Sequence, residues 1–147
     1  TTVATASTLR SVKAMKLASG AGTFQADEKI TQATSGAVGK VVEYDSTNRI
    51  IYYQQERFAD YGTPSDGNKD AFSGTYTITG APSSATGAPD AAADSSVDTG
   101  DSTVTFTNGF ANEEIEHDSG DILYTESRRP ISRASDQTED IKLIIEF

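Results

Sequence analysis

The chain has 147 residues and a formal net charge of −10, and it contains neither cysteine nor tryptophan. The lack of cysteine excludes disulfides and thiolate metal sites, and an acidic chain repels the phosphate backbone of nucleic acids. No stretch approaches the 18 or so apolar residues that a membrane-spanning helix needs. We therefore expect no nucleic-acid partner and no membrane anchor.

The charge is unevenly placed. Residues 1–80 carry eight acidic and eight basic side chains, whereas residues 81–147 carry fourteen acidic and four basic ones. We interpret the second part as an acidic surface in contact with water. The length suits one domain, or a small domain with a long appendage. Because the chain begins at Thr1 with no charged and then apolar leader, we expect no signal peptide and a fragment of a longer protein.

The first elements are short. Residues 9–17 predict an extended entry segment, although their imperfect alternation of polar and apolar side chains leaves a helix open. Residues 19–22 (SGAG) predict a turn or a flexible joint. Phe24 and Ile30 are the large apolar anchors of the next segment, and Ser35-Gly36 predicts another turn.

A β-hairpin gives the strongest local signal. Residues 38–44 and 50–53 are runs rich in β-branched and aromatic side chains. They flank a four-residue polar link, Asp45-Ser46-Thr47-Asn48. Two such runs around a short polar link are typical of a hairpin.

A loop and a strand follow the hairpin. Residues 58–71 are rich in Gly, Asp, Asn and Pro and predict a loop. Residues 72–79 alternate large apolar with small polar side chains and predict a half-buried strand. Its buried face would consist of Phe72, Gly74, Tyr76 and Ile78.

Residues 81–102 are of low complexity, with one valine, no aromatic residue and no larger aliphatic residue. Such a stretch cannot bury enough apolar surface to offset its ordering entropy by itself, so we predict a long surface loop. Val104 and Phe106 then predict a short strand, and Asn108-Gly109 predicts a turn.

The C-terminal part predicts two strands, residues 121–126 and 140–147, joined by a polar connection over residues 127–139. Ile144 lies on the outer face of the last strand, which fits either a strand covered on both sides or a scattered exposed apolar residue. The acidic spacing in Ser135–Asp140 fits either a single helical turn or a plain turn.

Together these elements predict a mainly β fold: an antiparallel β-sandwich or barrel-like structure with long loops and little helix. We expect one domain in three parts. These are a hairpin-containing module over residues 1–80, the surface loop over residues 81–102, and C-terminal strands over residues 103–147 that complete the β domain.

Catalytic residue sets are not evident. His117 is the single histidine, and the carboxylates around it in EEIEHDSGD favour its charged form, which makes a poor base. Carboxylate pairs can cleave glycosides, but 22 acidic residues produce pairs by chance, and the chain has no tryptophan to stack on a sugar. We therefore interpret the chain as not being an enzyme.

Two acidic clusters supply oxygen atoms that could bind calcium: Asp94, Asp98 and Asp101, and the segment Asp66-Gly67-Asn68-Lys69-Asp70. Neither matches the spacing of an EF-hand loop, and Lys69 places a cation within the second. We expect solvated loop acids, with no metal and no cofactor.

The last thirty residues, 118–147, carry an ordered set of features. In order these are Ser119-Gly120, Ile122, Tyr124, Glu126, Arg128, Pro130-Ile131, Asp136-Gln137-Thr138-Glu139 and an Ile-rich strand ending at Phe147. The set resembles the C-terminal end of the gene-product-eight family, the baseplate wedge proteins of T-even-type contractile-tailed phages and their marine relatives. An end at Phe147 fits a natural C-terminus.

Residues 22–44 carry a looser pattern, G-x-F-x-x-x-E-x-I-x-x-x-x-S-G-A-x-G-x-V. It is similar to short β-modules of many phage structural proteins. Such a module departs from the T-even form and fits a diverged, marine-phage version of the family. Residues 81–116 resemble no family.

The resemblance implies a β-sandwich-like structural protein that forms a homodimer and binds other baseplate wedge subunits. It would be made in the host cytoplasm and reside in the tail baseplate of the virion. The resemblance implies no reaction and no cofactor. The alternative is a receptor- or glycan-binding β domain of a phage tail, which six tyrosines and polar loops could serve. A tail-associated hydrolase is a third hypothesis.

The polar connection contains the residues for which we expect a role in assembly. They are Arg128, Arg129, Arg133, Asp136, Gln137, Thr138 and Glu139. Arginine forms bidentate pairs with carboxylates and is enriched at protein interfaces. These residues would either anchor the C-terminal hairpin internally or contact a partner subunit.

Overall fold

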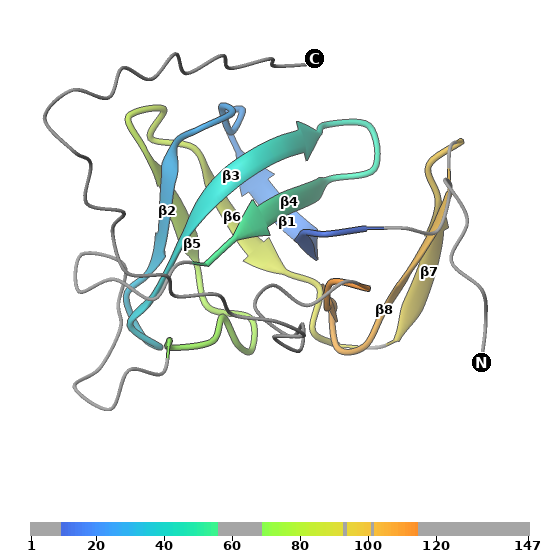
Figure 1. Ribbon diagram of the computed structural model, residues 1–147. Helices are drawn as coiled ribbons and strands as arrows, with labels where there is room; N and C mark the ends of the chain where they lie inside the picture. The colour runs from blue at the N-terminus through green and yellow to red at the C-terminus, as the bar shows by residue number, and fades with distance from the viewer. Residues whose placement is uncertain (1–9, 56–68, 93, 101, 115–147) are drawn as a thin grey trace, which may run out of the picture.

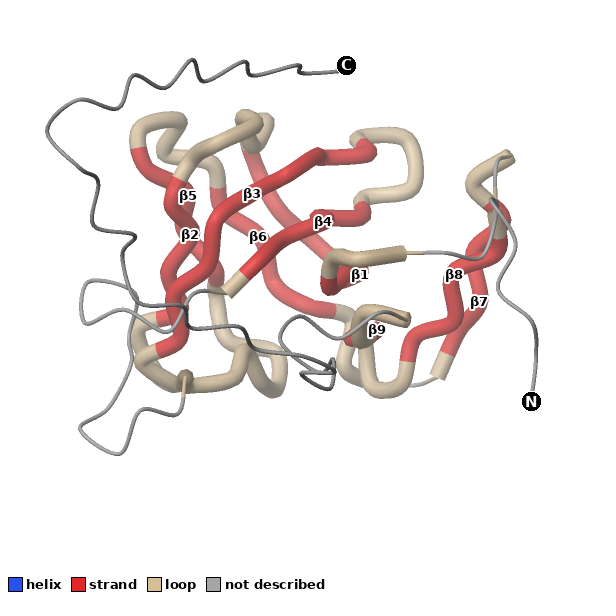
Figure 2. Tube along the Cα trace, in the orientation of Figure 1, coloured by secondary structure: helices blue, strands red, loops and turns tan. Residues whose placement is uncertain are grey.

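A computed structural model describes residues 10–55, 69–92, 94–100 and 102–114, which form nine β-strands (Figure 1). The strands are β1 (Lys13–Ala21), β2 (Lys29–Gln32), β3 (Ala37–Asp45), β4 (Ile50–Gln54), β5 (Ile78–Ala81), β6 (Thr86–Pro89), β7 (Ser95–Asp98), β8 (Thr103–Phe106) and β9 (Phe110–Ala111). Figure 2 shows strands and loops with no helix over these residues. The prediction of a mainly β, antiparallel, barrel-like fold is confirmed.

Six of the strands close into an antiparallel barrel. The order around it is β4-β3-β2-β5-β6-β1, and β1 pairs with β4 to complete the ring. Strands β2, β3 and β4 follow one another along the chain, whereas β1 lies beside β4, which is a Greek-key arrangement. Closure gives each of these six strands two neighbours in the ring, so none of them is an edge strand of an open sheet.

Strand β1 joins the two halves of the barrel because it uses both of its edges. Its first half pairs with β4 on one edge, and its second half pairs with β6 on the other. Residues 19–21 lie in this second half, so the predicted turn at residues 19–22 is wrong over most of its length. The small side chains suit a strand that approaches β6 closely: Gly20 pairs with Gly87.

The hairpin predicted over residues 38–53 is confirmed as β3 and β4. The side chain of Asp45 shapes its turn by accepting hydrogen bonds from the backbone N–H groups of Thr47 (2.9 Å) and Asn48 (3.0 Å). Burial alone would raise the pKa of Asp45, but the hydrogen bonds from Asn48 and Thr47 lower the pKa below its usual value. The turn predicted at Ser35-Gly36 is also confirmed, with Gly36 at a φ of 75°.

The predicted surface loop over residues 81–102 is wrong at two places, where β6 and β7 form. Strand β6 is an integral barrel strand between β5 and β1. A Cβ built on Gly87 would lie 2.6 Å from Cδ1 of Leu17, so the buried apolar surface comes from β1 and β6 supplies the space. A strand of this kind carries no hydrophobic signal of its own.

The predicted strand over residues 72–79 is also wrong for most of its length, since β5 begins only at Ile78. Phe72 and Ile78 are buried as expected, but Gly74 has a φ of 57° and Tyr76 is 49% exposed. The segment before β5 is held by side-chain hydrogen bonds in place of a ladder: Gln32 donates to the carbonyl of Tyr76 (2.9 Å).

The apolar residues form two clusters on opposite faces of the barrel wall. The inner cluster fills the barrel and includes Met15, Phe24 and Ile51. The outer cluster lies between the wall and the β8–β9 segment, with Ile50 packed against Phe106 and Val104. Adjacent residues of a strand point to opposite faces, which explains why Ile50 and Ile51 are both fully buried.

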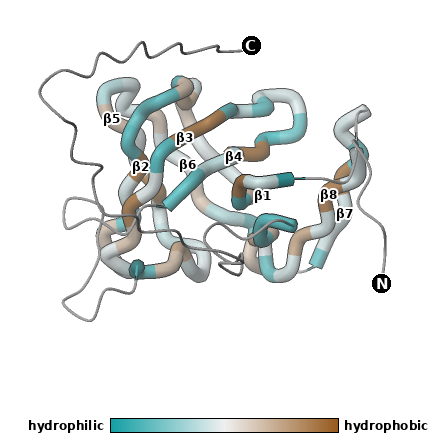
Figure 3. Tube along the Cα trace, viewed as in Figure 1, coloured by the Kyte–Doolittle hydropathy of each residue, from teal (hydrophilic) through white to brown (hydrophobic). Residues whose placement is uncertain are grey.

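Strands β7 and β8 form a separate two-stranded sheet beside the barrel (Figure 1). Figure 3 shows hydrophobic residues on β8 as well as on β3 and β4, while the β3–β4 turn is hydrophilic. The strand predicted at Val104 and Phe106 and the turn at Asn108-Gly109 are confirmed. The β7–β8 sheet is therefore a second layer that covers part of the outer wall.

Several predicted elements lie outside the described residues. These are the strands at residues 121–126 and 140–147, the connection at 127–139 with the turn at Ser135–Asp140, and most of the loop at 58–71. The division into parts 1–80, 81–102 and 103–147 stays a prediction.

Candidate functional site: the Lys13–Glu113 end of the barrel

The residues for which the sequence predicts an assembly role all lie outside the described part of the chain. They are Arg128, Arg129, Arg133, Asp136, Gln137, Thr138 and Glu139, and His117 and Ile144 lie outside it as well.

Two of the acids considered for calcium have structural roles in turns. Asp94 accepts a hydrogen bond from the backbone N–H of Asn108 (2.9 Å), and Asp98 accepts one from Gly100 (2.9 Å). Asp101 and Asp66 lie outside the described residues. Within the described ranges, no group of three or more His, Cys, Asp or Glu side chains is arranged to hold a metal ion.

The buried polar side chains inside the barrel act as clamps between loops. Glu28 is 3% exposed, and its carboxylate accepts hydrogen bonds from the backbone N–H groups of Gln25 (2.8 Å) and Ser83 (3.1 Å). Gln32 is fully buried and accepts from Ser73 N (2.9 Å) while donating to Tyr76. Both side chains bind backbone groups of neighbouring segments, so we assign them to folding.

The G-x-F-x-x-x-E-x-I pattern of residues 22–44 coincides with positions that build the barrel. Phe24, Ile30, Ala37 and Val41 belong to the inner cluster, and Glu28 is the clamp described above. The pattern therefore describes a barrel core and carries no chemistry of its own.

Polar chemistry gathers at the end of the barrel where β1 begins and β4 ends. We name this group the barrel-end cluster; it consists of Arg10, Lys13, Tyr53, Asn112, Glu113 and Glu114. Lys13 lies opposite Tyr53 across β1 and β4. Ala14 lies opposite Ala111 across β1 and β9, and continuing this register by one residue places Asn112 opposite Lys13 on its other side.

Lys13 Nζ lies between two side chains of the chain segment after β9. It lies 3.3 Å from Oδ1 of Asn112 and 3.5 Å from Oε2 of Glu113. The side chains of Lys13 and Glu113 are only 23% and 13% exposed. Oε2 of Glu113 is shielded from solvent and has no hydrogen-bond donor among the described residues, so its contact with Lys13 is an ion pair without hydrogen-bond geometry.

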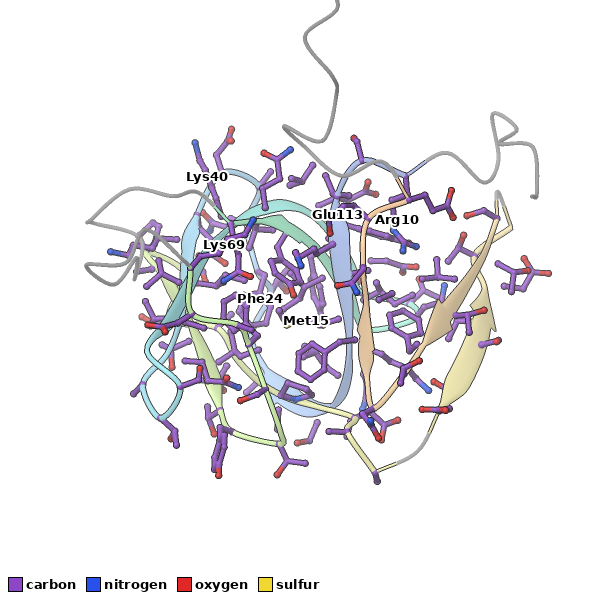
Figure 4. The ribbon with its side chains drawn as sticks, turned by 60° about the horizontal axis from the view of Figure 1, so that its bottom comes forward. Arg10, Met15, Phe24, Lys40, Lys69 and Glu113 are labelled. Carbon is purple, nitrogen blue, oxygen red and sulfur yellow. The ribbon has the colours of Figure 1, made fainter. Side chains whose placement is uncertain are left out.

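Arg10 and Glu114 hold this segment against the start of β1. The backbone N–H of Glu114 donates to the carbonyl of Arg10 (2.8 Å), and the backbone N–H of Arg10 donates to the Glu114 carboxylate (3.3 Å). The Arg10 guanidinium also donates to the backbone carbonyl of Asn112. Figure 4 shows Arg10 and Glu113 close together beside β1, with Met15 deeper in the core.

Tyr53 forms the buried wall of the cluster. Burial raises the pKa of its phenol far above the usual value, and the negative charge of Glu113 raises it further. Tyr53 is 4% exposed and packs edge-on against Phe72, with ring centroids 5.1 Å apart. Glu113 and Lys13 thus face an aromatic, largely water-excluded surface.

The outer face of the β7–β8 sheet is a second polar feature. Ser96 and Thr105 lie opposite each other with their hydroxyl oxygens 3.2 Å apart, and Asp98 lies opposite Thr103. All four side chains are exposed, whereas Val104 and Phe106 on the other face are buried. Among the described strands β7 pairs only with β8, so its other edge is free there. This face can form polar contacts with another protein surface.

The chain matches no protein-family model, no curated protein and no solved structure. No helix that could cross a bilayer occurs over the ranges that the structure describes.

Sequence reasoning did not single out Lys13, Asn112 or Glu113. Lys13 and Asn112 are 99 positions apart and carry no motif. Only the pairing of β1 with β9 brings them together.

Proposed function

We propose that this chain is a structural component of a phage tail baseplate wedge that acts through subunit–subunit contacts and catalyses no turnover. The observation that carries the proposal is the ordered resemblance of residues 118–147 to the end of the gene-product-eight family. Its partners would be other wedge subunits and a second copy of itself, and its location would be the virion baseplate.

Two features of the described residues support a role in assembly. The phage-module pattern of residues 22–44 occupies core positions of a closed barrel, which is a stable support for contacting segments. The exposed face of the β7–β8 sheet offers hydroxyl and carboxylate groups without a long hydrophobic edge. Exposed polar groups such as these are typical of the rims of interfaces between subunits.

Immunogold electron microscopy of phage particles, with antibody raised against this chain, tests the location. Label at the baseplate of intact or disrupted particles supports the proposal. Label at fibre tips would favour a receptor-binding domain, and particles without label would overturn the assignment to the virion.

Charge reversal at Arg128 and Arg129 tests the mechanism. If these residues contact a partner subunit, the double variant folds but fails to join the wedge complex in a reconstitution assay. A matched control is the double reversal of Lys29 and Lys40, which lie opposite each other on β2 and β3. Loss of folding in the Arg variant would instead assign these residues to internal anchoring.

A receptor- or glycan-binding domain is the second candidate. Tyr76 is 49% exposed, and exposed aromatic rings can stack on sugars. Reproducible binding on a glycan array that is lost in Tyr76→Ala, with Tyr44→Ala as the control, would favour this function over the structural one.

A further inference from the structure

We propose that Lys13 and Asn112 form an intramolecular isopeptide bond, with Glu113 as the catalytic residue. This inference is independent of the proposed function, because it concerns a single reaction of the chain with itself. It would assign a covalent role to the barrel-end cluster.

The three side chains have the geometry that such a bond requires. Lys13 Nζ is 3.3 Å from Oδ1 of Asn112, so the amine lies beside the side-chain amide whose carbon it would attack. Glu113 Oε2 is 3.5 Å from the same nitrogen, which puts a proton acceptor beside the nucleophile. Positioning of this kind replaces a bimolecular encounter with a local one and so lowers the barrier to attack.

The pairing of the strands holds this arrangement in place. Lys13 begins β1 and Asn112 follows β9, and the two strands pair through Ala14 and Ala111. Arg10 extends the pairing by contacting Asn112 and Glu114. The reacting groups therefore stay adjacent without a change in the backbone.

Glu113 is placed to take a proton from Lys13. Tyr53 is only 4% exposed, and Oε2 of Glu113 accepts no hydrogen bond among the described residues. The attack begins with transfer of a proton from the Lys13 ammonium to this oxygen, 3.5 Å away. The transfer yields the neutral amine that is needed as a nucleophile.

The reaction then balances as follows. The lone pair of Lys13 Nζ attacks Cγ of Asn112, and the C=O electrons move to Oδ1. Glu113, protonated by the first transfer, gives its proton to Nδ2, and the carboxylate so formed takes a proton from Nζ, so that the C–N bond to Nδ2 breaks and ammonia leaves. The C=O bond re-forms as a secondary amide, and no oxidant or other reactant is needed. Asn112 is exposed, which gives the ammonia a path to solvent.

The bond would close a loop across almost the whole described barrel, because its ends are 99 positions apart. Cross-links across long loops restrict the unfolded chain strongly. The chain has no cysteine, so a disulfide cannot supply such a cross-link.

The test is the intact mass of the purified full chain under denaturing conditions. We expect a mass lower than that of the sequence by one ammonia. Lys13→Arg, which keeps the positive charge beside Glu113, should show the full sequence mass, and so should Glu113→Ala. Asn112→Asp should lose one water in place of one ammonia, because a carboxylic acid then replaces the amide.

A second source of ammonia loss must be separated from the first. Asn108 is exposed in the turn that it forms with Gly109, and ring closure of this asparagine onto the next backbone nitrogen would release ammonia as well. Tandem mass spectrometry of the digest should find one branched peptide that joins the segments of Lys13 and Asn112. The proposal is overturned if the wild-type chain keeps its full mass after long incubation in the folded state, or if the loss persists in Asn112→Ala.

Discussion

Gly87 of β6 lies directly against Leu17 of β1: a Cβ added to the glycine would lie 2.6 Å from Cδ1 of the leucine. Leu17 is 3% exposed and belongs to the inner cluster. The contact joins a hydrophobic strand to a strand without large side chains, and it explains why residues 86–89 belong to the barrel.

Gly87→Val should therefore destabilise the barrel. The added methyl groups would push Leu17 out of its place, and overpacking of this kind costs about 1–3 kcal/mol in the free energy of unfolding. Urea denaturation measures the change. Ala18→Val is the matched control, because Ala18 is an exposed neighbour of Leu17 in the same strand. An unchanged midpoint for Gly87→Val would contradict the close approach of β1 and β6.

Glu28→Ala should be the most damaging removal of a carboxylate among the described residues. It leaves the backbone N–H groups of Gln25 and Ser83 without their acceptor in a partly buried place. The expected loss is about 2–4 kcal/mol, since each buried unsatisfied group costs about 1–3 kcal/mol. Glu28→Gln keeps one acceptor oxygen and should lose less. Glu43→Ala on the exposed side of β3 should change stability by at most about 0.5 kcal/mol. Equal losses of stability for Glu28→Ala and Glu43→Ala would refute the stabilising role of the hydrogen bonds that Glu28 accepts.

Tyr53 should make the barrel sensitive to alkali. The folded state raises the pKa of this phenol above its ordinary value of 10.0, so the stabilisation is fully present below pH 10. Above that pH the unfolded chain releases the proton while folded Tyr53 retains it, and stability falls by up to about 1.4 kcal/mol per pH unit.

Urea titrations between pH 9 and pH 11, on the order of one unit around the ordinary phenol pKa, measure this slope. Tyr53→Phe should remove part of the alkaline loss, and Tyr76→Phe, at an exposed ring, is the matched control. Identical slopes for wild type and Tyr53→Phe would show that Tyr53 ionises as freely in the folded state as in the unfolded one.

Phe106→Ala should loosen the second layer. Phe106 is fully buried between β8 and the outer wall of β1 and β4. Truncation of a buried phenylalanine costs about 3–5 kcal/mol. Hydrogen exchange of the β7 and β8 amides should accelerate more than that of β2 and β3, because the inner cluster remains intact. Thr105→Ala on the exposed face is the control. A uniform acceleration would mean that the two layers unfold as one unit.

The local sequence was sufficient to predict a strand or turn where the segment itself has a clear hydrophobic pattern or turn residues. The hairpin at residues 38–53, the anchors Phe24 and Ile30, and the strand at Val104 and Phe106 all follow from alternating or β-branched runs around turn residues. The prediction failed at residues 72–77, where Gln32 donates one hydrogen bond to the carbonyl of Tyr76 and accepts one from the backbone N–H of Ser73 in place of a strand ladder.

The sequence by itself determined that this protein is built from antiparallel strands, because apolar alternation and turn chemistry are local properties of the chain. Only the tertiary structure decided that β6 is a strand and that Lys13, Asn112 and Glu113 meet. The physical reason is the same in both cases. A strand of small residues such as β6 is stabilised by the surface of its neighbour. Two side chains 99 positions apart become neighbours only through the pairing of β1 with β9.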